Sequence, residues 1–253
     1  MARRREIPSK AIQLTARAGF ITRNIFSTFL FPNRPARSQL RAWSRLLDSG
    51  YFVRHADPRM SDVFILNKGK RQISQEVDGI IVRPPYTGVI RHDETALKGI
   101  LIIEDHGFLD SWRVESEFKI LGRDTIKLES HGTSNKFPDA ILDFKAPVQR
   151  IRVAIEIELT LKDRRRYQRI LNSYSFAEGL QLILFICASD TIESAISEIA
   201  QSHFMPPKGL EIGFMDKADW LEDPILGTVK LKNRYCTLGT WIDEKEKEQI
   251  QQE

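Results

Sequence analysis

The chain has few cysteines and no long apolar runs. Its only thiols are Cys187 and Cys236, far apart in sequence, which argues against a disulfide framework and against a Cys-x-x-Cys metal site. The apolar stretch at residues 181–188 has the length of a strand, and no run approaches the roughly 20 residues of a membrane span. The arginine-rich N-terminus is not followed by a signal-peptide core. We therefore expect a cytoplasmic protein without membrane association, in which both thiols are ordinary buried side chains.

Positive charge is concentrated in the first third of the chain. With 253 residues, of which 42% are hydrophobic, the sequence can bury one substantial core or two modest ones. Residues 1–75 hold 15 Lys and Arg against 4 Asp and Glu, a net charge of +11, whereas the remainder carries −7. A basic module joined to a mildly acidic one is typical of a polyanion-binding domain attached to a carboxylate-bearing catalytic domain. A solvated cationic surface is the alternative.

The basic module has the pattern of a winged helix-turn-helix. Caps, breakers and apolar spacing predict helices over residues 9–17, 22–31 and 37–49. Two short strands, residues 51–55 and 62–66, flank a polar turn. Three helices followed by a hairpin are typical of winged helices, whose third helix enters a DNA groove, although such domains also dock proteins. We predict this domain over residues 1–75.

Basic and amide side chains on the third helix and beside the wing are the candidate DNA contacts. Arginine and glutamine on a helix can reach base edges or phosphates, and basic side chains near a wing can bind the backbone. The candidates are Arg37, Gln39, Arg41, Arg45, Arg54, Arg59, Lys68, Lys70 and Arg71.

From residue 76 to 242 the predicted order of strands and helices indicates a mixed-sheet α/β domain. Helices are predicted over residues 92–104, 110–121, 163–174 and 191–201, and residues 181–188 form a fully apolar strand that a sheet covered on both faces would contain. Residues 243–253 form a charged tail, a solvated helix or a disordered segment, to which we assign no chemistry.

The strand predicted over residues 152–162 has an unusual polar face. Side chains alternate along a strand, so an apolar row from Val153 to Leu161 faces one side while Glu156, Glu158 and Lys162 share the other. Two carboxylates at this spacing repel each other, and a partly desolvated pair needs a cation to offset its charge. A divalent metal ion would supply that charge.

A third carboxylate is predicted to lie beside this strand. Residues 136–144 read as a strand in which Asp139 follows a proline, and the turn that follows makes the two segments neighbouring antiparallel strands. Asp139 would then lie close to Glu156, and such an oxygen-rich set favours Mg²⁺ or Mn²⁺. Metal ions and a nearby lysine are what phosphodiester cleavage requires. The helix that follows carries Arg164, Arg165 and Arg169, which would hold the DNA backbone.

These motifs resemble the PD-(D/E)xK superfamily of restriction-endonuclease-like proteins. Pro138-Asp139 matches the first half of its motif and Glu156-Ile157-Glu158 the second, with Glu158 at the position of the usual lysine and Lys162 as its substitute. With the preceding winged helix, the chain is similar to MOB-C conjugative relaxases and replication-relaxation proteins.

The resemblance implies metal-dependent, site- and strand-specific nicking of double-stranded DNA at a plasmid or mobile-element transfer origin. Asp139, Glu156 and Glu158 would be catalytic and metal-binding residues, Lys162 the basic residue, and Glu117 a helix-borne acid. A coupling ATPase and an accessory mobilisation protein would be partners. The common relaxases hold their metal with a His-hydrophobic-His cluster, and no two of the five histidines here have that spacing.

The sequence leaves alternatives open for both the nucleophile and the activity. Tyr167 is a candidate nucleophile, but Tyr167 and Tyr174 also fit the apolar stripe of their helix, which favours a core role, and water is the simpler nucleophile. Because Glu158 replaces the usual lysine, the protein is alternatively a non-catalytic DNA-binding accessory protein or transcriptional regulator with a degenerate nuclease fold. A defence or repair nuclease that cuts both strands is the third interpretation.

Overall fold

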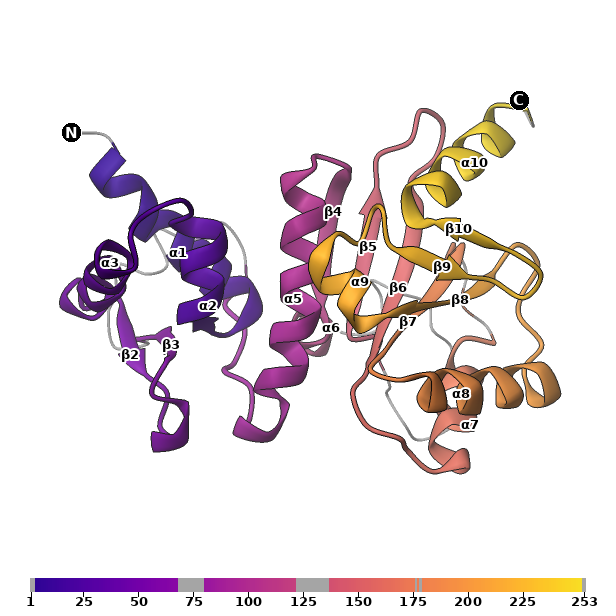
Figure 1. Ribbon diagram of the computed structural model, residues 1–253, viewed down its shortest axis with the longest axis horizontal. Helices are drawn as coiled ribbons and strands as arrows, with labels where there is room; N and C mark the ends of the chain where they lie inside the picture. The colour runs from indigo at the N-terminus through magenta and orange to yellow at the C-terminus, as the bar shows by residue number, and fades with distance from the viewer. Residues whose placement is uncertain (1–2, 68–79, 122–136, 176, 178, 252–253) are drawn as a thin grey trace. The chain divides into compact units, whose positions relative to one another are not determined.

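The computed structural model describes residues 3–67, 80–121, 137–175, 177 and 179–251 of a mixed α/β protein (Figure 1). Contacts divide the chain into two units, Met1–Glu94 and Thr95–Glu253. We predicted the boundary after residue 75, but residues beyond it contact the first unit, since Val82 donates its amide proton to the carbonyl of Ala16 at 2.8 Å. Within the described ranges no helix has both the length and the apolar character needed to cross a membrane.

The first unit combines helices with a three-stranded antiparallel sheet in the order β1-β3-β2. Thr22 begins the second helix as predicted, because its Oγ1 accepts a hydrogen bond from the amide of Ile25 at 3.1 Å. The elements are α1 (Arg3–Ala18), β1 (Ile21–Thr22), α2 (Arg23–Ile25), the π-helix η1 (Phe26–Leu30), α3 (Ala36–Asp48), β2 (Phe52–Arg54), the 3₁₀-helix η2 (Pro58–Met60) and β3 (Val63–Leu66).

An aromatic cluster joins helix α3 to this sheet. Trp43 of α3 stacks on Phe64 of β3 with 3.8 Å between ring centroids, and Phe26 of η1 lies 5.5 Å from the same indole. The three predicted helices and the hairpin are present, while β1 was not predicted, because a two-residue strand leaves no alternation to detect. The first helix begins earlier than predicted, at Arg3.

The second unit is built on a seven-stranded mixed sheet in the order β10-β9-β8-β7-β6-β5-β4. Strands β4, β5 and β6 are antiparallel, whereas β6, β7 and β8 are parallel. The elements are η3 (Thr87–Val89), α5 (Ile90–Asp105), β4 (Leu109–Val114), α6 (Glu115–Leu121), β5 (Ala140–Phe144), β6 (Ile151–Glu158), α7 (Arg164–Ser173), β7 (Leu182–Cys187), α8 (Asp190–His203), β8 (Glu211–Asp216), α9 (Lys217–Glu222), β9 (Thr228–Lys230), β10 (Tyr235–Thr237) and α10 (Leu238–Ile250). Its first two elements lie partly or wholly before Thr95.

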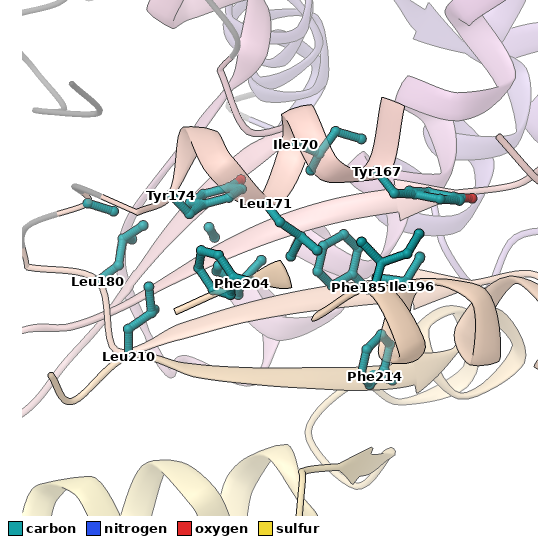
Figure 2. Close-up of a cluster of buried hydrophobic side chains, with 14 of the residues drawn as sticks. Tyr167, Ile170, Leu171, Tyr174, Leu180, Phe185, Ile196, Phe204, Leu210 and Phe214 are labelled. Atoms are coloured by element: carbon teal, nitrogen blue, oxygen red, sulfur yellow. The ribbon is translucent and has the colours of Figure 1, made fainter. Parts of the chain in front are cut away.

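Helices cover the central strands. Helices α7 and α8 pack on the side that carries Ala154 of β6 and Phe185 of β7, where their apolar side chains form one continuous cluster (Figure 2). Helices α9 and α10 contact β7 and β6 through residues outside this cluster, and Trp220 and Trp241 are fully buried there. All six side chains of β7 are buried, as predicted for its apolar sequence.

Two predictions about the second unit are wrong. Residues 110–121 were predicted as one helix, but Leu109–Val114 forms the edge strand β4 and only Glu115–Leu121 is helical. Pairing with β5 stabilises the extended conformation, a tertiary effect that overrides local helical spacing. Strand β6 also ends at Glu158, so the predicted apolar row does not continue and Leu161 is 56% exposed.

The charged tail is helical over most of its length. Helix α10 extends to Ile250 and therefore includes most of the tail predicted at residues 243–253. Thr237 caps this helix by accepting from the amide of Thr240 at 3.0 Å. Burial of Trp241 and Ile242, just before the charged sequence, anchors the helix to the sheet.

Candidate functional site

Two buried glutamates on β6 form the centre of the candidate site. Glu156 is 1% exposed and Glu158 is fully buried. Their register partners on β7 are Phe185 and Cys187, which belong to the cluster under α7 and α8, so both carboxylates point toward those helices. Burying ionised carboxylates costs several kcal/mol unless they receive hydrogen bonds or opposite charge. Helix α7 and the loop before it supply such contacts.

Tyr174, at the end of α7, holds Glu156. Its hydroxyl donates a hydrogen bond to Glu156 Oε1 over 2.5 Å, and the whole side chain is buried. Burial raises the pKa of Tyr174 well above its ordinary value, and the negative charges of Glu156 and Asp139 raise it further. The phenol therefore stays protonated and acts as a donor. The hydrogen bond links the C-terminal end of α7 to one of the two buried glutamates.

Glu158 is paired with Lys162. The ammonium group lies 2.7 Å from Glu158 Oε1, and the lysine side chain is only 19% exposed. The backbone amide of Lys162 donates to the hydroxyl of Tyr167 at 3.1 Å, which connects the loop to α7. Lys162, the proposed substitute for the motif lysine, thus contacts Glu158, which occupies the position of the usual lysine.

Tyr167 lies in the core (Figure 2). The side chain is 1% exposed, and burial raises the pKa of Tyr167 to about 12. A phenol that is both covered and hard to ionise is a poor nucleophile, since attack on phosphate requires access and loss of the proton. These properties favour the core interpretation of Tyr167.

Asp139 lies beside β6, as predicted. Strands β5 and β6 pair with Ala140 opposite Ile155, so Asp139 occupies the next position, opposite Glu156. Its Oδ2 accepts a hydrogen bond from the amide of Ile157 at 2.7 Å, and its own amide donates to the carbonyl of Ile155 at 3.1 Å. This position is where the regular pairing of β5 and β6 ends.

Glu117 has a structural contact close to Asp139. Its Oε2 accepts from the amide of Val114 at 3.1 Å, the reciprocal half of a capping box at the start of α6. The next amide, that of Glu115, donates to the carbonyl of Asp139 at 2.9 Å. Glu117 is therefore part of the junction that supports Asp139.

The acidic residues were predicted to hold a metal ion. Among the residues with described positions, no three His, Cys, Asp or Glu side chains come together as a metal-binding group. The chemistry of a smaller set nevertheless fits Mg²⁺, which is commonly bound by one or two carboxylates and retains several waters. Asp139 and Glu156, which occupy opposite positions on neighbouring strands, are the two that match.

Arginines cover the outer face of α7. Arg164, Arg165 and Arg169 are exposed, as a backbone-binding role requires, and so is Arg166, which was not predicted. Arg164 also forms an ion pair with Glu198 of α8 at 2.9 Å. The helix begins at Asp163, which accepts from the amide of Arg166.

The predicted DNA contacts of the first unit divide into exposed and structural residues. Exposed arginines are Arg37, Arg41 and Arg45 on α3, together with Arg54 and Arg59 on the hairpin. Gln39 instead donates through its side-chain amide to the carbonyls of Ser27 and Phe31, both at 3.2 Å, and so joins α3 to η1. Lys68, Lys70 and Arg71 lie outside the described residues.

The hairpin arginines have local partners. Arg59 forms a salt bridge with Asp57 at the start of η2, with 2.6 Å between Nη2 and Oδ2. The hydrogen bonds from Arg59 hold the pKa of Asp57 well below its ordinary value. Arg54 donates to the carbonyl of Ser61 at 3.2 Å. Both side chains remain accessible, so these contacts orient them without removing them from solvent.

Sequence reasoning missed the contact between Tyr174 and Glu156. Tyr174 was assigned to the apolar stripe of its helix, and its ring does belong to the core cluster. The available signal was the seven-residue spacing of Tyr167 and Tyr174, which places two hydroxyls on one helix face directly after an acidic strand.

Comparisons with known proteins assign no family to this chain. No protein-family model matches it, and the searches found no match among curated proteins or solved structures. Its function is therefore argued from its own residues and their arrangement.

Proposed function

We propose that the protein is a metal-dependent DNA nickase that cuts one strand at a plasmid or mobile-element transfer origin. The observation that carries the proposal is the placement of Asp139 opposite Glu156 on neighbouring strands, where the pairing of β5 and β6 ends. Two carboxylates from adjacent strands beside a cationic helix provide the groups that phosphodiester cleavage requires.

The architecture supports both parts of this proposal. A mixed sheet that is antiparallel from β4 to β6, parallel from β6 to β8 and antiparallel again to β10 is compatible with the restriction-endonuclease-like fold that the sequence resemblance implies. Three helices followed by a hairpin, with sheet order β1-β3-β2, are compatible with a winged helix that binds double-stranded DNA. The exposed arginines of α3 would contact the duplex.

In this mechanism, Asp139 and Glu156 would hold Mg²⁺ or Mn²⁺. The ion would polarise the scissile phosphate and lower the pKa of an attacking water. Lys162 would stabilise charge that develops on the phosphate, and Glu158 would hold its ammonium group in place. The exposed arginines of α7 would bind the DNA backbone next to the cut. A coupling ATPase and an accessory mobilisation protein are expected partners from the resemblance alone.

Plasmid relaxation tests this proposal directly. Supercoiled plasmid carrying the region that flanks the coding sequence should become open circular with Mg²⁺ or Mn²⁺. Asp139→Ala and Glu156→Gln should abolish nicking, whereas Glu222→Gln, which changes an exposed carboxylate on α9, should leave it intact. Equal relaxation by the wild type and the two site variants would refute the assignment. A linear product would indicate the double-strand nuclease instead.

A non-catalytic DNA-binding protein is the second candidate. The observation that favours it is the salt bridge between Lys162 and Glu158, which neutralises the lysine that catalysis would use. This interpretation predicts tight, metal-independent binding of the flanking DNA without cleavage under any divalent ion. Electrophoretic mobility shifts with and without a chelator, together with the plasmid assay, separate the two functions.

A further inference from the structure

The hydroxyl of Tyr174 is unnecessary for packing. Its ring lies in an apolar cluster with Ile170, Leu171 and Leu180, where phenylalanine would fill the same space. Burying a hydroxyl without a partner is unfavourable, so a tyrosine at this position gains only if its oxygen has a specific contact. That contact is the 2.5 Å hydrogen bond to Glu156 Oε1.

The hydroxyl of Tyr174 contacts Glu156, and the hydroxyl of Tyr167 contacts Lys162, the partner of Glu158. Tyr167 and Tyr174 are separated by two helical turns and lie on the face toward the sheet (Figure 2). The hydroxyl of Tyr174 contacts Glu156 directly, whereas the hydroxyl of Tyr167 accepts from the backbone amide of Lys162. Helix α7 follows β6 after a short loop and is capped by Asp163. The helix therefore orients one glutamate through a side chain.

We propose that Tyr174 is a positioning residue that orients Glu156 for binding a divalent metal ion. This inference builds on the proposed function. A hydrogen bond to one oxygen of a carboxylate defines the plane and direction of the group, as residues that support metal ligands do elsewhere.

Mn²⁺ binding to Tyr174→Phe tests the role without requiring cleavage. Residues that support metal ligands typically contribute about 10- to 100-fold to metal affinity, and a loss of that size is expected. Ser173→Ala removes another buried hydroxyl from α7, one that donates to the carbonyl of Ile170, and should retain wild-type affinity.

The outcomes distinguish this inference from the proposed function. If the wild type binds Mn²⁺ and Tyr174→Phe binds it with the same affinity, the positioning role is refuted while the nickase proposal stands. If the wild type binds no Mn²⁺, both are refuted. Circular dichroism shows whether each variant is folded.

A measurement on the wild-type chain covers the case in which Tyr174→Phe does not fold. Tyrosines labelled with ¹³C at the ring carbon that bears the hydroxyl report on their hydrogen bonds. Titration with Mg²⁺ should shift the Tyr174 signal, assigned by elimination with phenylalanine variants of the others, and leave the exposed Tyr86 and Tyr235 unchanged. Saturation with Mg²⁺ without movement of the Tyr174 signal would refute the inference.

Discussion

The pair formed by Lys162 and Glu158 predicts a large, pH-dependent loss of stability in Lys162→Met. Methionine retains much of the side-chain volume but removes the ammonium group that lies 2.7 Å from a fully buried carboxylate. Breaking a buried ion pair by removing one partner costs about 3–5 kcal/mol. Since the lysine is 19% exposed and water already screens part of the interaction, we expect about 2–3 kcal/mol. Acidification should reduce the loss by neutralising the glutamate.

A matched surface pair provides the control. Lys119 and Glu115 have the same four-residue separation and a distance of 2.9 Å, but both side chains are substantially exposed. Lys119→Met should therefore change stability by less than about 0.5 kcal/mol. The double variant Glu158→Gln/Lys162→Met should recover at least about 1 kcal/mol, because an amide is less costly to bury than an isolated charge.

Urea unfolding followed by far-ultraviolet circular dichroism, at neutral and at acidic pH, measures these differences for the transition of the second unit. Equal midpoints for Lys162→Met and Lys119→Met would refute the reasoning. So would a loss that is independent of pH, since the predicted destabilisation depends on the charge of Glu158.

Three further changes test other parts of the structure. Gly99→Ala would direct a methyl group into the indole of Trp220, so it should destabilise the protein by about 2–3 kcal/mol and alter the tryptophan fluorescence. Unchanged stability would contradict this packing. Tyr167 should ionise near pH 12, seen as the ultraviolet difference between the wild type and Tyr167→Phe. Folding raises the pKa of Tyr167 from 10.0, so the stability that this residue contributes should be complete below pH 10 and lost as the pH rises through 12. An ionisation midpoint of Tyr167 near pH 10 would contradict its burial. Thr22→Ala removes the cap on Ile25 and should cost about 1 kcal/mol in thermal unfolding, while Thr22→Ser should retain most of the stability.

The sequence predicted elements whose pattern is local. The alternation along β6 and the apolar run of β7 identified both strands, and the apolar face that includes Tyr167 and Tyr174 identified α7. The turn after residue 144 led to the correct pairing of β5 with β6. In each case the signal lies within a few consecutive residues.

Elements defined by distant contacts were missed. Trp112 and Phe118 suggested one helix, but Trp112 belongs to β4, whose extended conformation depends on β5, nearly thirty residues later in sequence. Likewise, the seven-residue spacing of Tyr167 and Tyr174 places both hydroxyls on one helix face, but it does not show that the hydroxyl of Tyr174 contacts Glu156, because that contact requires α7 to fold back on β6. The candidate acids could be predicted from sequence, while the groups that orient them could not.

Strand β7 also creates a risk of aggregation while the chain is being synthesised. Until α7, α8 and β8 are in place, the six consecutive apolar residues Leu182–Cys187 form a segment of high β-propensity without charge, which favours association between chains. Its final partner on one side, β8, is synthesised more than twenty residues later. The adjacent strands bear Glu156, Glu158 and Asp216, and like charges on stacked copies would repel one another. Glu156 and Glu158 of the candidate site would therefore also disfavour association between chains during synthesis.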